Sequence, residues 1–231
     1  MSSQQGQGEV NIRLACVDMA GTVMLDGGLV LEAFRAALTG AGVEGPAFGP
    51  AMEYAHETMG LSKSVVFRHL LGSDELVALA LSEFDSAIDA AIKEGRVTEI
   101  PGATSTMAAI RAAGTKVCLT TGFSAEVQRA VIDHLGWEDV TDFFMAPSET
   151  VRGRPFPDMV LAAALKAQVD DVREVAVVGD TANDLWSGHR AGASVVAGVL
   201  TGSHNREELG GAPHTHILAS ILDFPALLST G

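Results

Sequence analysis

Short apolar runs alternate with helical patterns along this 231-residue chain, and this alternation most constrains its fold. Each run is apolar throughout, as expected for strands buried on both faces of a sheet. Helical patterns separate the later runs, at 124–136, 158–169 and 182–193. Together they predict an α/β protein whose parallel sheet is covered by helices on both faces. We expect strands at 14–17, 117–119, 175–178 and 194–199, and a weaker one at 143–145.

The segment 27–99 has a different pattern. It contains helical stretches at 29–42, 63–72 and 73–95, and no convincing strand lies among them. Because this segment follows the first strand directly, we expect an inserted helical cap over 27–99. The α/β core then comprises 13–26 and 100–231. The sequence "EIPGA", at 99–103, marks the return to the core.

The composition excludes several classes of partner. Hydrophobic residues make up 47% of the chain and charged residues 19%, which permits a buried core. The formal net charge of −14 argues against nucleic acid and anionic membranes. No run approaches the roughly 18 apolar residues of a membrane span. Residues 1–12 lack the features of a signal peptide and are expected to be a flexible tail. Cys16 and Cys118 lie in predicted strands, so we expect buried, reduced thiols and a cytoplasmic protein.

Polar residues follow several predicted strands, where ligands bind in open parallel sheets. Asp18 follows the first strand, and Asp180 and Asp184 follow the fourth in "GDTAND". Carboxylates this close together need a neutralising charge, and hard oxygen ligands without histidine suit Mg²⁺. A helix cap is the alternative for Asp184, whereas a metal site is favoured for Asp18 and Asp180 together.

Two further segments offer groups that bind an anion. Thr121 and Gly122 supply a hydroxyl and backbone amides at a strand-to-helix turn. The same sequence, "TTGFSAE", also suits a helix N-cap, and both roles are compatible. Arg154, in "VRGRPFPD", offers a guanidinium fork for a phosphoryl group, with a surface arginine as the alternative. A metal site, backbone amides that bind an anion, an arginine and an aspartate together indicate phosphoryl transfer through an aspartyl intermediate.

Four motifs then resemble a known family. "VDMAGTV", "LTTGF", "GRPFPD" and "VVGDTAND" resemble, in order and spacing, those of the haloacid dehalogenase superfamily. The resemblance covers nearly the whole chain after the tail, with the helical insertion in the place of that family's cap. It implies a Rossmann-like core, Asp18 as nucleophile, and Mg²⁺ held by Asp18, the Ala20 carbonyl and Asp180, with Asp184 orienting the metal shell. The residues implied to bind substrate are Thr22, Gly60, Thr121, Gly122 and Arg154.

Ala20 narrows the resemblance to one branch. Most phosphatases of this superfamily carry a second acid at that position, which protonates the leaving oxygen. "DMAGT" and the arginine of "GRP" resemble instead the phosphonatase branch, which cleaves carbon–phosphorus bonds. There a lysine forms a Schiff base with a neighbouring carbonyl and takes up the electrons of the broken bond. The substrate implied is a small 2-oxo-alkylphosphonate such as phosphonoacetaldehyde.

Lys63 is the candidate for that lysine among the four in the chain. Val66, Phe67 and Leu70 follow it at helical spacing, which places Lys63 on the apolar face of a helix. Burial there lowers the pKa of an amine, as a Schiff-base lysine needs. "MGLSK", at 59–63, also resembles the cap segment that carries the family's lysine. The alternative is a first-turn lysine whose stem only covers apolar neighbours.

The match departs from phosphonoacetaldehyde hydrolase at two positions. Val66 stands where that enzyme has a histidine that helps proton transfer, and Gly28 roughly where it has a cysteine. His56 is a candidate replacement for the histidine, and His69 a weaker one. The sequence "HTH" at 214–216 is expected to be a surface turn more than a metal site.

Three interpretations follow from these observations. The favoured one is a Mg²⁺-dependent phosphonatase-like hydrolase. An ordinary phosphomonoesterase acting on a small phosphorylated metabolite is the alternative, and in it Lys63 is dispensable. A binding or regulatory module is the third, against which the intact Asp18, Asp180 and Arg154 argue. A homodimer through the cap is expected by analogy with relatives.

Overall fold

A six-stranded parallel sheet forms the centre of the computed structural model, which describes residues 11–228. The strand order is β3-β2-β1-β4-β5-β6, so β1 lies between β2 and β4. All neighbouring strands are parallel. The strands are β1 (Leu14–Asp18), β2 (Lys116–Thr120), β3 (Phe143–Met145), β4 (Val175–Gly179), β5 (Val195–Val199) and β6 (His216–Leu218).

The first five strands confirm the predicted ones, with small differences at their ends. The prediction missed β6, an edge strand of three residues. The surface turn predicted at 214–216 is wrong for His216, which begins this strand and pairs with Ala197 of β5. A strand this short, with only two apolar residues, carries too little periodicity to be recognised in the sequence.

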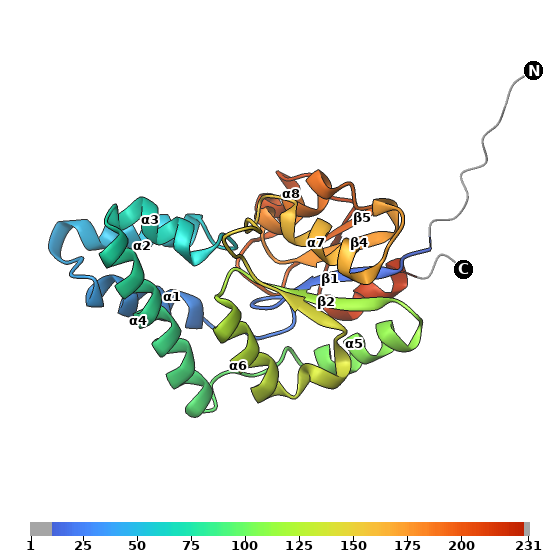
Figure 1. Ribbon diagram of the computed structural model, residues 1–231, viewed down its shortest axis with the longest axis horizontal. Helices are drawn as coiled ribbons and strands as arrows, with labels where there is room; N and C mark the ends of the chain where they lie inside the picture. The colour runs from blue at the N-terminus through green and yellow to red at the C-terminus, as the bar shows by residue number, and fades with distance from the viewer. Residues whose placement is uncertain (1–10, 229–231) are drawn as a thin grey trace, which may run out of the picture.

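Helices cover both faces of the sheet, as predicted (Figure 1). Ala15 and Val17 of β1 belong to one core cluster together with residues of α5 and α6. Leu14 and Cys16 point to the opposite face and pack in a cluster with residues of α7. Cys16 and Cys118 are paired residues of β1 and β2, and both are buried, free thiols. The core helices are α5 (Ala103–Ala112), α6 (Ala125–Leu135), α7 (Asp158–Ala167), α8 (Ala182–Ala191) and α9 (Arg206–Gly210).

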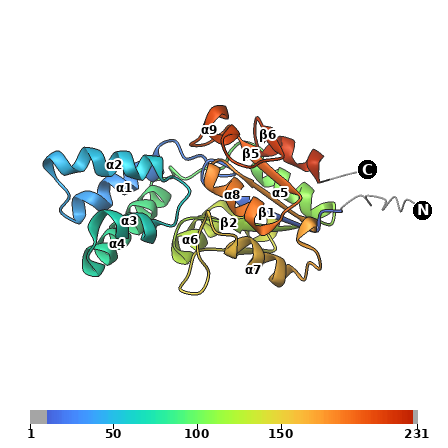
Figure 2. The ribbon, with the colours of Figure 1, turned by 90° about the horizontal axis from the view of Figure 1, so that it is seen from above.

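Four helices follow β1 directly and lie together at one end of the molecule (Figure 2). They are α1 (Leu29–Gly40), α2 (Phe48–Glu57), α3 (Lys63–Leu71) and α4 (Asp74–Lys93). Phe34, Phe67 and Phe84 pack at the centre of this helical insertion, with the Phe34 and Phe84 ring centroids 5.2 Å apart. The division into a cap domain over 27–99 and a core domain stays a prediction. The tail predicted at 1–12 lies, up to residue 10, outside the described residues.

The remaining regular segments are short 3₁₀ helices. They lie at Gly45–Ala47, Trp137–Val140, Val172–Glu174 and Ile221–Leu227. Within residues 11–228, no helix combines the length and apolar character needed to cross a membrane.

The insertion is joined to the core by hydrogen bonds at the carboxyl ends of the strands. The Lys63 amide donates to the carbonyl oxygen of Gly122 (3.2 Å), which follows β2. The Asn183 side chain, at the start of α8, donates to the Met59 carbonyl (2.8 Å). Ser124 donates to the carboxylate of Asp85 in α4 (2.9 Å). These bonds close the segment 59–63 over the polar edge of the sheet.

Candidate active site

The carboxyl ends of β1, β2 and β4 and the segment 59–63 enclose a small cavity of about 20 Å³. Most residues predicted from the sequence line it: Asp18, Ala20, Gly60, Lys63, Thr121, Gly122, Arg154 and Asp180. Residues that the sequence analysis missed also line it: Asp26, Val30, Met59, Phe123, Thr181 and Ser203. A space of this size holds about one water molecule, so it is too small for a phosphonate as it stands.

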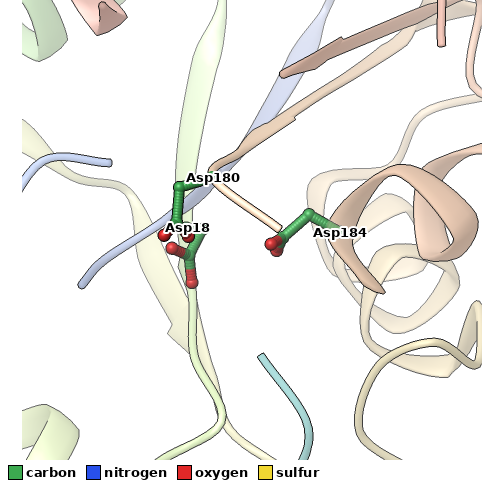
Figure 3. Close-up of side chains that lie close together, drawn as sticks. All are labelled: Asp18, Asp180 and Asp184. Carbon is green, nitrogen blue, oxygen red and sulfur yellow. The ribbon is translucent and has the colours of Figure 1, made fainter. Parts of the chain in front are cut away.

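Three buried carboxylates meet beside this cavity (Figure 3). Asp18, Asp180 and Asp184 each offer an oxygen within 4.8 Å of the others. Burial raises the pKa of Asp18 to about 6, against the opposing charge of Arg154. Burial and the charge of Asp18 raise the pKa of Asp180 well above its usual range. The cluster therefore holds negative charge only where cations compensate it.

Arg154 supplies one of those cations. Its Nη1 lies 2.6 Å from Oδ1 of Asp18 and also donates to Oδ1 of Asp184. The side chain is buried, which rules out the alternative of a surface arginine. Burial lowers its pKa, but the charges of Asp18 and Asp184 outweigh this and leave the pKa above its usual value. Nε is buried and has no hydrogen-bond partner among the described residues, so one donor stays available for a ligand.

The donor set fits a magnesium ion. When all three carboxylates are ionised they bring three negative charges, whereas Arg154 and Lys63 bring at most two positive ones, so a further cation would balance the cluster. The donors are hard oxygens, which Mg²⁺ prefers. Backbone packs closely around Asp180, since a Cβ on Gly202 would lie 2.0 Å from its Oδ2. The Ser203 amide donates to the same oxygen (2.6 Å) and orients the carboxylate.

Lys63, the first residue of α3, is buried in an aromatic cage. Its Nζ lies 5.0 Å from the ring centroid of Phe34 and 5.6 Å from those of Phe84 and Phe123. Burial, followed by the charge of Arg154, lowers the pKa of Lys63 to about 8, with Asp18, Asp26 and Asp180 opposing the shift. Lys63 lines the cavity and is buried, so it does not extend past apolar neighbours to solvent.

Thr22 makes a contact that differs from its predicted one. Its hydroxyl donates to Oδ2 of Asp18 (3.0 Å), and the side chain does not line the cavity. It is therefore placed to orient the aspartate and not to bind substrate directly. The family resemblance implied that Thr22 binds substrate, but in the structure its hydroxyl contacts Asp18.

Three other predicted residues also have local structural roles. Asp184 accepts hydrogen bonds at Oδ2 from the amide (3.2 Å) and hydroxyl (2.5 Å) of Thr181, so the helix-cap alternative holds alongside its contact with Arg154. Thr121 accepts the Phe123 amide (3.1 Å), whereas Ser124 caps α6. Gly60 has a φ of +86°, and a Cβ there would lie 2.3 Å from the Thr181 hydroxyl.

Neither candidate histidine lies at the cavity. His69 is exposed and stacks on Tyr54 with ring centroids 4.2 Å apart, and His56 is exposed. Neither candidate is therefore placed at the cavity to take over the role of the family's histidine. Asp26, which the sequence reasoning missed, does line the cavity. In the sequence Asp26 is an acidic residue in the turn before a helix, and acidic residues are common in such turns, so nothing distinguished it.

Comparison with known proteins agrees with this geometry. The model of the haloacid dehalogenase-like hydrolases matches residues 12–192. A phosphonoacetaldehyde hydrolase from Parabacteroides distasonis is 33% identical over 126 residues, which are 53% of this chain and 46% of that protein. The matched segment thus spans less than half of that curated relative.

Solved structures share the fold. A hydrolase from Pseudomonas syringae superimposes with a TM-score of 0.81 at 21% identity, over 94% of this chain and 97% of that one. A phosphonoacetaldehyde hydrolase-like protein from Oleispira antarctica gives 0.77 at 22% identity, over 94% and 91% of the two chains. The match of the family model over most of the sequence shows that this chain belongs to the haloacid dehalogenase-like hydrolases.

Proposed function

We propose that the protein is a Mg²⁺-dependent hydrolase that cleaves the carbon–phosphorus bond of a small 2-oxo-alkylphosphonate, such as phosphonoacetaldehyde. The observation that carries the proposal is one cavity lined by both Asp18 and a buried lysine whose pKa falls to about 8. A phosphomonoesterase needs the aspartate but has no use for the amine. The named curated relative supports the same substrate class over half of the chain.

At the phosphorus, Asp18 is the nucleophile and forms an aspartyl-phosphate. Thr22 donates to its Oδ2 and Arg154 to its Oδ1, and these two bonds orient the carboxylate. Thr121, Gly122 and Arg154, which line the same cavity, bind the phosphonate oxygens. The residues that would hold Mg²⁺ are Asp18, the Ala20 carbonyl, Asp180 and, through its shell, Asp184. The ion would neutralise charge on the phosphonate oxygens.

At the carbon, Lys63 supplies the activation that an acid cannot. Its nitrogen forms a protonated imine with the carbonyl next to the C–P bond. When that bond breaks, its electron pair forms a C=C bond and the C=N pair moves onto nitrogen, giving an enamine. Protonation of the enamine carbon and hydrolysis of the imine then release the carbonyl product and return the amine. A second water hydrolyses the aspartyl-phosphate, which releases phosphate and returns the Asp18 carboxylate. Ala20 stands where an acid would otherwise protonate a leaving oxygen, because no oxygen leaves.

The first experiment measures phosphate release from phosphonoacetaldehyde with Mg²⁺. Wild type, Lys63→Ala and Lys93→Ala are compared, the last as a control because Lys93 is exposed on α4. We expect release by wild type and Lys93→Ala and none by Lys63→Ala. Turnover of simple phosphate esters by both wild type and Lys63→Ala, without release from the phosphonate, identifies a phosphomonoesterase instead.

A further inference from the structure

We propose that Asp26 is the acid–base residue that carries protons between the nitrogen of Lys63 and the carbonyl oxygen of the substrate. This inference rests on the proposed function and assigns a step for which the expected histidine is absent. Val66 stands at that position, and neither His56 nor His69 lies at the cavity.

The position of Asp26 suits this role. It lies between β1 and α1 and lines the same cavity as Lys63. Its Oδ1 accepts the Val30 amide (2.9 Å), which fixes the side chain at the start of α1. Its Oδ2 accepts no hydrogen bond from residues 11–228 and is free to receive a proton. The side chain is half-buried, so the carboxylate keeps some hydration beside the apolar cage.

The other titratable residues at the cavity have other tasks. Asp18, Lys63, Arg154 and Asp180 complete the set with Asp26. Arginine keeps its proton at any physiological pH, so Arg154 does not transfer one. Asp18 attacks phosphorus, and Asp180 belongs to the carboxylate cluster. Asp26 is the remaining carboxylate among the residues that line the cavity, and a positioned carboxylate can accept a proton and return it.

The proton balance of imine formation requires such a group. Lys63 begins as an ammonium with three protons and ends as a protonated imine with one. Asp26 accepts the first proton, and the freed lone pair forms the C–N bond while the carbonyl π pair moves to oxygen. Asp26 returns that proton to the oxygen. It then takes a second proton from nitrogen to the new hydroxyl, which leaves as water as the C=N bond forms. Asp26 ends as the carboxylate it was.

The test isolates this step by trapping the imine. Phosphonoacetaldehyde and sodium borohydride are added together, and the reduced adduct on Lys63 is followed by mass spectrometry over time. Wild type is compared with Asp26→Asn, which keeps the oxygen that accepts the Val30 amide. Asp89→Asn is the control, because Asp89 is an exposed carboxylate of the insertion that does not line the cavity. Lys63→Ala defines the background.

We expect Asp26→Asn to trap the imine about 100-fold more slowly or worse, since a positioned acid–base group typically contributes that much. Asp89→Asn should trap at the wild-type rate. Trapping by Asp26→Asn at the wild-type rate overturns the role of Asp26 and leaves the proposed function standing. No Lys63-dependent trapping in wild type overturns the proposed function itself.

A pH series separates proton transfer from a purely electrostatic effect. The charged groups that face Lys63 are Asp18, Asp26, Asp180 and Arg154, and the charge of Asp26 raises the pKa of Lys63. If Asp26 acted through charge alone, Asp26→Asn would move the profile of trapping to lower pH with an unchanged maximum rate. Such a shift contradicts the proposal, whereas a lowered maximum rate at every pH supports it.

Discussion

Arg154 and Asp18 form a buried ion pair, with Nη1 of the arginine 2.6 Å from Oδ1 of the aspartate. Replacing Arg154 by alanine leaves two buried carboxylates without this partner, which typically costs about 3–5 kcal/mol of unfolding free energy. Arg152, whose pair with Asp158 is largely exposed, is the matched control. Its replacement should cost less than about 1 kcal/mol. Urea denaturation measures both.

The loss of unfolding free energy in Arg154→Ala should also depend on pH. The pKa of Asp18 is already raised to about 6 in the folded protein, and removing the arginine raises it further. A carboxyl whose folded pKa exceeds its unfolded value takes up protons on folding, so stability from this group increases as pH falls through that pKa. Arg154→Ala should therefore lose less unfolding free energy at pH 5 than at pH 7. Equal losses at the two pH values would contradict the buried ion pair between Arg154 and Asp18.

Magnesium should stabilise the folded protein through the three buried carboxylates. An ion that binds only the folded state raises its melting temperature as the metal concentration exceeds the dissociation constant. We expect Mg²⁺ to raise the melting temperature of wild type and to have little effect on Asp180→Asn. Asp139→Asn, at an exposed acid far from the cluster, should respond like wild type. Equal shifts in all three proteins would place the metal elsewhere.

Lys63→Met should stabilise the protein at neutral pH. Burial lowers the folded-state pKa of Lys63 from 10.5 to about 8, so its charged form carries a cost that is fully present below pH 8. Above pH 8 the folded state releases this proton before the unfolded state does, and the cost declines towards pH 10.5. Methionine removes up to about 3 kcal/mol of this cost. Lys93→Met is the exposed control, and thermal melts at pH 7 and pH 10 make the comparison.

Gly60→Ala should impair closure of the insertion on the core. A Cβ at this residue would lie 2.3 Å from the Thr181 hydroxyl, and its φ of +86° is strained for alanine. We expect the rate of phosphate release to fall at least tenfold, a loss of about 1.4 kcal/mol of transition-state stabilisation. Gly49→Ala provides the control, because a Cβ there meets nothing within 4 Å and φ is ordinary. Similar activity in both variants would show that segment 59–63 does not close as tightly as described.

The sequence predicts the sheet and the acidic edge well, because both depend on local signals. The apolar run ending at Asp18 indicates a buried strand, and polar residues beyond it lie at the carboxyl edge of any parallel sheet. The strand β6 was missed, because two apolar residues at the sheet edge leave no pattern.

The surroundings of Lys63 could not be predicted from the sequence, for another reason. Phe34, Phe84 and Phe123 lie far apart in the chain, and nothing in their own segments marks them as neighbours of an amine. Each would be assigned to a core by its hydrophobicity alone. Asp26 likewise belongs to a turn whose sequence is ordinary, and only the tertiary fold brings it to the cavity.

The aromatic cage is built from two parts of the molecule. Phe34 and Phe84 belong to helices of the insertion, as Lys63 does, whereas Phe123 follows β2 in the core. Withdrawal of the insertion would remove one wall, rehydrate the amine and return its pKa towards the value of a free lysine. The open enzyme would then carry an ordinary, protonated lysine that does not react with passing aldehydes. Selectivity would thus depend on when the insertion closes as well as on the shape of the cavity, since Lys63 would become a nucleophile only while a substrate is enclosed.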